Sequence, residues 1–273
     1  MTPPSLPAWL LDILACPVCH ASLPSSGDCP CGQRFDLSAT VPDLLIGDFP
    51  LGDAYDRMAD TAARRAREEP ERFTHIDHAL LRAARGRTLD LGCGVGRMLG
   101  ALEARAEHVV GVDLSGESLA RARARGFTVV RADALRLPFR SGSFNAVVSG
   151  FGTFAHLPLR DAAREVARVL APGGIFAFHN FGAKALVAAQ VLAGLVRLRR
   201  PRLTTGFHTE AIRRWRDVEA ALAAAGLRVI EAVGRLHVPG LARLSGRRLY
   251  TRRRFLLPWC WDVVIVAQGR PGP

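Results

Sequence analysis

The chain has 273 residues, of which 49% are hydrophobic, and it carries a formal net charge of +12. This length predicts one or two domains, and the hydrophobic content excludes a disordered chain because it suffices for a full globular core. The charge resides on arginine, since Lys184 is the only lysine, and it fits either an anionic partner such as RNA or an arginine-rich but ordinary enzyme.

The first residues do not read as a signal peptide. Met1-Thr2-Pro3-Pro4 has no cationic start before an apolar core. The longest apolar candidate for a membrane span, Ala185 to Leu198, is interrupted by Gln190 and Arg197 and falls short of the ~20 residues required. We therefore expect a cytoplasmic protein without a membrane span.

Four of the six cysteines form two pairs close to the N-terminus: Cys16, Cys19, Cys29 and Cys31. Thiolates clustered in this way suit tetrahedral zinc, which can close a fold too small for its own core. Disulfides are the competing interpretation, although they are rare in a reducing cytoplasm. The second pair is spaced C-x-C rather than C-x-x-C, which leaves the fourth ligand open, with His20 as the nearest substitute.

The next segment reads as a linker followed by helix. Gly47 to Gly52 contains Pro50, and Asp53 to Arg85 is rich in Ala, Arg and Glu with apolar positions at helical spacing. Tyr55 and Met58 lie one turn apart, where they either cover a ligand site or pack on a sheet.

A glycine-rich turn then organises the rest of the chain. The strand Thr88 to Leu91 leads into Gly92-Cys93-Gly94-Val95-Gly96, and a helix is predicted from Val95 to Arg105. Strand, glycine turn and helix form the layout of a nucleotide-type cofactor site in a doubly wound sheet. Asp113 ends a second strand about twenty residues later, where a ribose-binding carboxylate belongs.

Further strands and helices alternate after this turn. Ser115 is a natural N-cap, and Gly226 should end a helix. The predicted strands are 108–113, 127–133, 143–149, 227–233 and 261–267, together with a turn and a strand within 170–178. The predicted helices are 115–125, 159–170, 183–198 and 209–225.

This succession resembles the class I S-adenosylmethionine-dependent methyltransferases over roughly Tyr55 to Ala267. The segments that carry the resemblance are DLGCGVG, VVGVDLSGESL, ADALRLPF and LAPGG. It implies an α/β, Rossmann-like seven-stranded methyltransferase fold whose last strand is antiparallel. It also implies that Asp113 binds the ribose, Asp133 the adenine amino group and Asp90 the methionine ammonium. The implied cofactor-binding residues are Asp90, Gly92, Cys93, Gly94, Asp113, Leu114, Asp133, Ala134 and Ser149.

The N-terminal segment resembles the small zinc ribbons that accompany methyltransferases. The resemblance rests on LLDILACPVCHASL, the short cysteine pair and VPDLL. Some such ribbons are separate activators, and others are fused, as in the family that methylates N1 of a guanine in large-subunit ribosomal RNA. It implies a zinc-ribbon domain at 1–47, a helical linker at 48–85 and a methyltransferase domain at 86–273 with inserts at 183–206 and 237–259.

The position after the fourth strand narrows the chemistry. Ser149-Gly150-Phe151-Gly152 lacks both the Asn/Asp-Pro-Pro-aromatic motif of amino-group enzymes and the Pro-Cys of pyrimidine-C5 enzymes. Methylation of adenine N6, cytosine N4 or pyrimidine C5 is therefore disfavoured, and we expect the acceptor to be another nucleophilic N or O. His156 and His179 are the candidate general bases, although a histidine at such a position more often packs or covers the cofactor.

The acceptor is left open between two classes. A ribosomal RNA base is favoured by the ribbon and by the loop from Leu241 to Trp259, whose arginines alternate with Tyr250, Phe255 and Trp259. A small or lipophilic metabolite is favoured by the apolar segment from Ala185 to Leu198. A non-catalytic module that only retains cofactor is the third interpretation, and the oligomeric state is not predicted.

Overall fold

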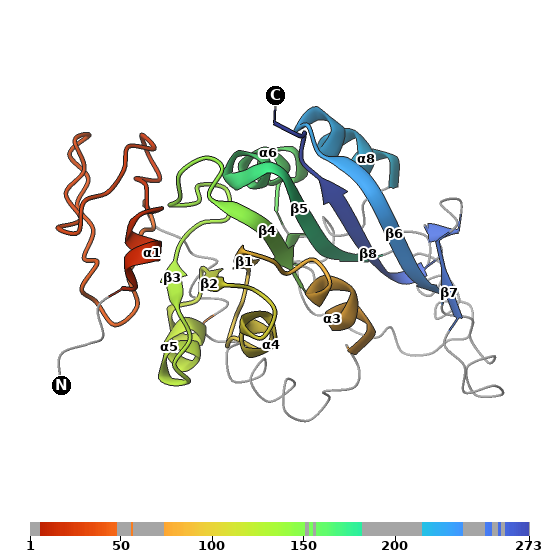
Figure 1. Ribbon diagram of the computed structural model, residues 1–273, viewed down its shortest axis with the longest axis horizontal. Helices are drawn as coiled ribbons and strands as arrows, with labels where there is room; N and C mark the ends of the chain where they lie inside the picture. Colours follow the sequence, from red (N-terminus) through yellow and green to blue (C-terminus); the bar gives the residue numbers. More distant parts are fainter. Residues whose placement is uncertain are drawn as a thin grey trace, which may run out of the picture.

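The computed structural model describes residues 6–47, 56, 74–150, 153–154, 157–181, 215–236, 249–252, 256–257 and 260–272. One twisted sheet with helices on both faces forms the centre of this part (Figure 1). The strands are β1 (Arg87–Leu91), β2 (His108–Asp113), β3 (Val129–Arg131), β4 (Phe144–Ser149), β5 (Leu170–Phe181), β6 (Arg228–Leu236), β7 (Leu249–Thr251) and β8 (Cys260–Gln268). The helices are α1 (Ala8–Leu11), α3 (Thr74–Leu81), α4 (Leu99–Glu103), α5 (Gly116–Ala124), α6 (Leu159–Val169) and α8 (Trp215–Ala224).

The strand order is β3-β2-β1-β4-β5-β8-β6-β7. The first five strands are parallel, and β8 runs antiparallel between β5 and β6. This confirms the expected Rossmann-like methyltransferase fold, in which the antiparallel strand predicted at 261–267 is β8. The structure adds one strand that was not predicted, β7, which lies within the predicted insert at 237–259 and pairs with β6 at the edge of the sheet.

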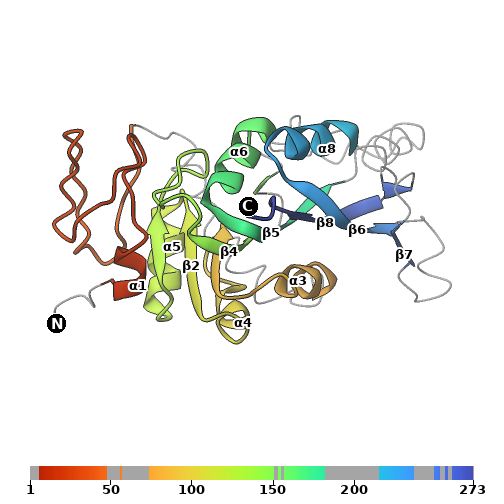
Figure 2. The ribbon, with the colours of Figure 1, turned by 45° about the horizontal axis from the view of Figure 1, so that its top comes forward.

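Helices cover both faces of the sheet. Figure 2 separates α6 and α8 on one face from α3 and α4 on the other. Because parallel strands are buried on both sides, they read as continuous apolar runs, and β1, β2 and β4 are almost wholly buried. One core cluster contains residues of α6 and α8, and a second contains residues of α3, α4 and α5. The strand ends that carry the candidate site are thus held from both sides.

Several predicted boundaries differ from the observed ones. The helix after the glycine turn, α4, begins at Leu99 rather than at Val95, because Gly94 and Gly96 take positive φ angles of 52° and 76° that a helix cannot hold. The strand β3 is shorter than predicted, and β5 continues to Phe181. Ser115 caps α5 as expected, since its Oγ accepts the Ser118 N–H at 3.1 Å.

Several sequence predictions fall outside the described residues. They concern Tyr55, Met58, Phe255, Trp259 and the apolar segment 185–198. Among the helices that the structure describes, none is both long and apolar enough to cross a membrane.

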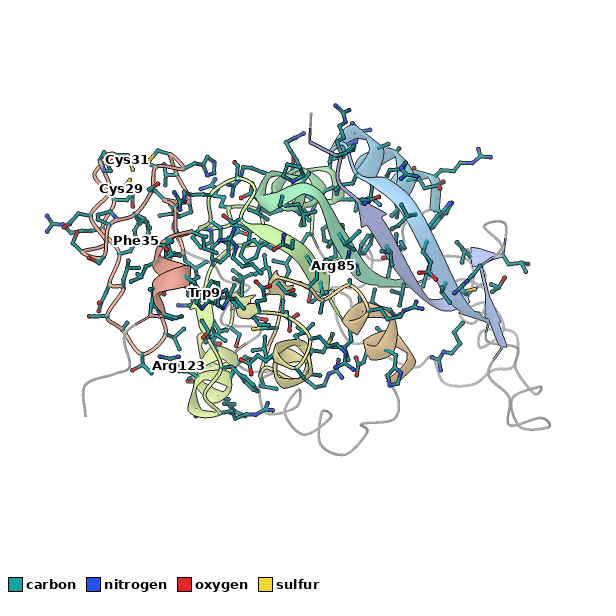
Figure 3. The ribbon with its side chains drawn as sticks, in the orientation of Figure 1. Trp9, Cys29, Cys31, Phe35, Arg85 and Arg123 are labelled. Carbon is teal, nitrogen blue, oxygen red and sulfur yellow. The ribbon has the colours of Figure 1, made fainter. Side chains whose placement is uncertain are left out.

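The N-terminal segment, residues 6–47, packs beside β3 at one end of the sheet (Figures 1 and 2). Leu10, Leu14 and Phe35 are buried in the same core cluster as residues of β1, β2 and α6. Trp9 stacks on His108 at the start of β2, with ring centroids 4.7 Å apart (Figure 3). The segment therefore shares the apolar core of the sheet instead of building one of its own.

Candidate functional site

The glycine turn links β1 to α4 at the carboxyl ends of the parallel strands. Backbone N–H groups of Gly92 and Cys93 both donate to the Val112 carbonyl, at 2.7 and 3.0 Å, and this anchors the turn against β2. A Cβ placed on Gly94 would meet no atom within 4 Å, so the outer side of the turn is open. The backbone there is accessible to a ligand, as a cofactor-binding turn requires.

Asp113 lies at the end of β2 and faces this turn. Its Oδ2 accepts the Gly94 N–H at 2.8 Å, and its Oδ1 accepts the Ser115 N–H at 2.9 Å. Each carboxylate oxygen retains a second lone pair for a further donor, such as a ribose hydroxyl. Burial raises the pKa of this carboxyl above its usual value, and the backbone N–H donors oppose that rise.

Asp90 occupies β1 directly before the turn and is only 3% exposed. It pairs across the sheet with Gly111 of β2 and Val148 of β4. Burial raises the pKa of Asp90 to about 7, while the nearby Arg97 guanidinium lowers it. Burial disfavours the charged form of this acid, and a cationic ligand group placed beside it would restore that form and be attracted to it.

The other expected cofactor residues lie at the same edge of the sheet. Asp133 follows β3, and its Oδ1 accepts the Leu135 N–H at 2.9 Å. The Ala132 N–H donates to the Asp113 carbonyl at 3.2 Å, so the loops after β2 and β3 lie side by side. Leu114 and Ala134 belong to these two loops, Cys93 is buried in the turn, and the Ser149 hydroxyl donates to the Leu91 carbonyl at 3.0 Å.

Three polar residues of this region escaped the sequence analysis. Arg97 forms a two-point ion pair with Asp77 of α3, at 2.5 and 2.8 Å, and so fixes the end of the glycine turn. Asp56 accepts the Ser115 Oγ–H at 2.6 Å and the Glu117 N–H at 3.1 Å, at the start of α5. The position of Arg97 directly after the glycines was a signal from which its role could have been predicted. No feature of the sequence indicates that Asp56 contacts Ser115, which lies 59 positions later.

Of the two candidate bases, only His179 lies within the described residues. His179 is buried in β5, with 1% of its surface exposed, opposite Val264 of β8. Ser149 pairs with Phe178, so His179 lies near the carboxyl end of the sheet. His156 is outside the described residues.

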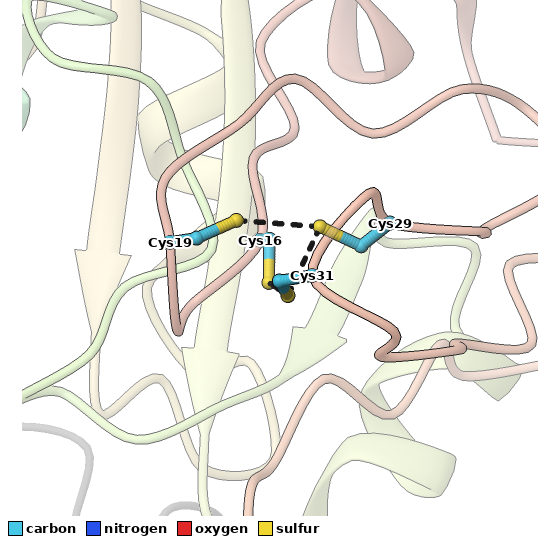
Figure 4. Close-up of side chains that lie close together, drawn as sticks. All are labelled: Cys16, Cys19, Cys29 and Cys31. Carbon is cyan, nitrogen blue, oxygen red and sulfur yellow. Dashed lines mark hydrogen bonds between the residues drawn. The ribbon is translucent and has the colours of Figure 1, made fainter.

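The four N-terminal cysteines meet at one point of the segment 6–47 (Figure 4). Their Sγ atoms all lie within 4.8 Å of one another, and no disulfide joins them. The Sγ atoms are separated by 3.6 Å for Cys16–Cys31, 3.4 Å for Cys19–Cys29 and 3.3 Å for Cys29–Cys31. A tetrahedral site with Zn–S bonds of about 2.3 Å needs sulfur separations of about 3.8 Å, so the donor set fits zinc after small adjustments.

Two tight turns present these thiols. His20 has a φ of 59° and donates its N–H to the Cys16 carbonyl at 2.9 Å, which closes the first turn. In the second turn Gly32 has a φ of 89° and donates to the Cys29 carbonyl at 2.9 Å, so that C-x-C spacing still brings both sulfurs together. His20 was the expected substitute ligand, but it serves as a turn residue and does not join the cluster of four thiols found among the described residues.

Comparison with known proteins agrees with this arrangement. Residues 89–178 match the family described as Methyltransferase domain. The chain is 44% identical over 107 residues to a demethylmenaquinone methyltransferase of Thermus thermophilus, covering 36% of this chain and 48% of the relative. It is 40% identical over 89 residues to a probable tRNA methyltransferase 9B of Mus musculus, covering 31% of this chain and 19% of the relative.

Solved structures give the same fold over a longer stretch. An S-adenosylmethionine-dependent methyltransferase from Mesorhizobium loti superposes with a TM-score of 0.53 and 25% identity, covering 72% of this chain and 97% of that chain. The chain spans less than half the length of the first curated relatives it matches. The shared part is therefore the methyltransferase domain with its glycine turn and the strands around it.

Proposed function

We propose that this chain is an S-adenosylmethionine-dependent methyltransferase that acts on an N or O nucleophile. The observation that carries the proposal is the joint placement of Asp90, Asp113 and Asp133 around an open glycine turn. A scaffold that only bound a partner would have no need of these acids. The match of residues 89–178 to the methyltransferase domain supports the same conclusion.

Different residues of the chain would bind different parts of the cofactor. Asp113 would accept the ribose hydroxyls, Asp133 the adenine amino group, and Asp90 the methionine ammonium. The backbone of Gly92 and Gly94 would pass close to the methionine part, with Cys93, Leu114, Ala134 and Ser149 around it. The bound cofactor supplies a methyl group activated on a sulfonium. The protein orients this group in line with the acceptor and excludes water.

His179 and His156 remain our candidates for holding the acceptor proton. The first lies near the end of β5, one position past the residue that pairs with Ser149. A histidine there is close to the strand ends that bind the cofactor, where general acid–base catalysis needs it.

We also propose that Cys16, Cys19, Cys29 and Cys31 hold one structural zinc ion. A zinc ion bound there would close the two tight turns of the segment 6–47, hereafter the ribbon. The four sulfurs already converge to within 4.8 Å of one another. The backbone N–H of Gln33 and the neighbouring Cys29 thiol lower the pKa of Cys31 to about 7, which favours the thiolate that a metal requires.

The affinity for S-adenosylmethionine should rise with pH. Asp90 has a raised pKa of about 7 in the ligand-free protein, so it is mostly protonated at pH 6, and only its ionised form attracts the ammonium. Binding at pH 7 should therefore release protons, and affinity should increase about five- to tenfold from pH 6 to pH 7.5. Calorimetry in two buffers of different ionisation enthalpy measures both effects. In Asp90→Asn the affinity should change little with pH. If the pH dependence of the affinity is the same as in the wild type, it arises from another titrating group.

For the acceptor we propose a ribosomal RNA base first, because the net charge is +12 and one relative is named a tRNA methyltransferase. Arg252 is paired with Glu231 at 3.0 Å, so its replacement would also break an ion pair within the protein, and we place the test on Arg253 and Arg254. Replacing Arg253 and Arg254 by Ala should flatten the salt dependence of RNA binding by about two phosphate contacts.

A gel-shift titration at two salt concentrations measures this slope. The control is Arg160→Ala with Arg164→Ala on α6, which removes the same charge from two exposed positions. If both double variants show the same salt dependence of RNA binding, the acceptor is instead our second candidate, a lipophilic metabolite. That candidate is favoured by the 44% identity to a demethylmenaquinone methyltransferase.

A further inference from the structure

The ribbon continues the sheet beyond its edge strand β3. Asp43 forms a parallel bridge with Arg131, the last residue of β3. The Arg131 N–H donates to the Pro42 carbonyl at 2.9 Å, and the Leu44 N–H donates to the Arg131 carbonyl at 2.9 Å. The two bonds seat the ribbon on the strand whose end leads into the loop with Asp133.

The side chain of Arg131 joins the ribbon to the cofactor site. Its Nη1 lies 2.9 Å from Asp43 Oδ2, and its Nε donates to the Leu114 carbonyl at 2.9 Å. Leu114 directly follows Asp113, the acid that accepts the Gly94 and Ser115 N–H groups. One guanidinium, with 26% of its side chain exposed, therefore spans the ribbon and the loop that presents the ribose-binding acid.

A second contact braces the loop after β3. The Ala15 N–H donates to the Pro138 carbonyl at 3.0 Å, and the Arg140 N–H donates to the Ile13 carbonyl at 2.9 Å. From the other side, Glu165 of α6 accepts the Leu137 N–H at 2.7 Å. The loop that begins at Asp133 is thus held between the ribbon and α6.

We infer that Arg131 is a positioning residue through which the ordered ribbon raises the affinity of the site for S-adenosylmethionine. This inference rests on the proposed function, because it assigns the cofactor to the loop after β2. The ribbon is then an activator in the same chain, acting without touching the cofactor. Because Arg131 is ion-paired with Asp43 and also donates to the Leu114 carbonyl, it would orient that carbonyl and the backbone of Asp113 with it.

The coupling must also run in the opposite direction. If ribbon order favours cofactor binding, then bound cofactor favours ribbon order by the same factor. S-adenosylmethionine should therefore slow the loss of zinc from the four cysteines to a chelator. This effect distinguishes a positioning role of Arg131 from a merely structural one.

The first test measures cofactor affinity by calorimetry on the full chain. Arg131→Ala should weaken binding about tenfold, the scale expected for a lost charge-assisted hydrogen bond. Asp43→Asn keeps the bond to Leu114 and should lose about threefold, and Arg131→Lys should fall between wild type and Arg131→Ala. Arg164→Ala, which breaks only the exposed pair with Asp161, is the charge-matched control and should bind as wild type does.

The second test follows zinc transfer to a colorimetric chelator with and without saturating S-adenosylmethionine. Cofactor should slow the transfer in the wild type and in Arg164→Ala, but not in Arg131→Ala. Wild-type affinity in Arg131→Ala would overturn the inference; if that variant does not fold, wild-type affinity in folded Asp43→Asn does so. Failure of the wild type itself to bind cofactor would instead refute the proposed function.

Discussion

Asp113→Ala is expected to weaken S-adenosylmethionine binding by about one to two orders of magnitude. The reason is that two ribose hydroxyls would lose a charged acceptor, a loss of about 1.5–3 kcal/mol. The substitution also leaves the Gly94 and Ser115 N–H groups without the carboxylate that holds them at 2.8 and 2.9 Å. Calorimetric titration of the purified variant measures the change.

The matched control is Asp161→Ala, which removes an acid from an exposed position on α6. It should leave the affinity unchanged. Asp113→Asn should retain part of the binding, because an amide oxygen still accepts one hydrogen bond. Equal affinities for wild type and Asp113→Ala would contradict the placement of the ribose at the end of β2.

Removal of the metal is expected to unfold the ribbon while the sheet persists. The thiols at positions 16, 19, 29 and 31 converge without a disulfide, so a bound ion would link the two turns to each other. Metal analysis should find one zinc per chain in the wild type and in Cys260→Ala, a cysteine outside the ribbon. Cys29→Ser should lose the zinc, and limited proteolysis should then cut between residues 15 and 41.

The opposite outcome is equally clear. Less than about a tenth of an equivalent of zinc in the wild type, with four thiols free to react, would exclude the metal site. If the zinc-free ribbon resists protease, its packing against the sheet is enough to keep it folded without the metal. Leu10, Leu14 and Phe35 share the core of the sheet, so this packing is a real competitor to the metal.

The cofactor half of the site was readable because its signals are local. The run from Asp90 to Gly96 fixes a strand, an acid and a turn within seven residues, and the structure shows positive φ angles at all three glycines of that turn. Ser115 was recognised as a cap for the same reason, since its partner Ser118 is three residues away. Short-range chemistry of this kind needs no knowledge of the tertiary fold.

What sequence reasoning missed depends on contacts between distant segments. The ion pair of Asp77 with Arg97 spans twenty residues, the bond from Ser115 to Asp56 spans 59, and that of Arg131 with Asp43 spans 88. No periodicity encodes such pairs. The ribbon was predicted as a domain closed by metal, and its burial against β3 became visible only when the sheet edge was in place.

The strand β7 was missed for a related reason. Its three residues pair with β6 inside a segment rich in arginine and aromatic residues, which the sequence presents as a loop. A strand this short is defined by its neighbour rather than by its own pattern.

The most direct test of the account is methyl transfer itself. Wild-type protein and Asp113→Ala would be incubated with methyl-labelled S-adenosylmethionine and, separately, with ribosomal RNA and with a cell metabolite extract. Our account predicts that the wild type labels one of the two pools and that Asp113→Ala, at limiting cofactor, labels it at least about tenfold less. Equal labelling by the two proteins, or a wild type that neither binds the cofactor nor labels either pool, would contradict it.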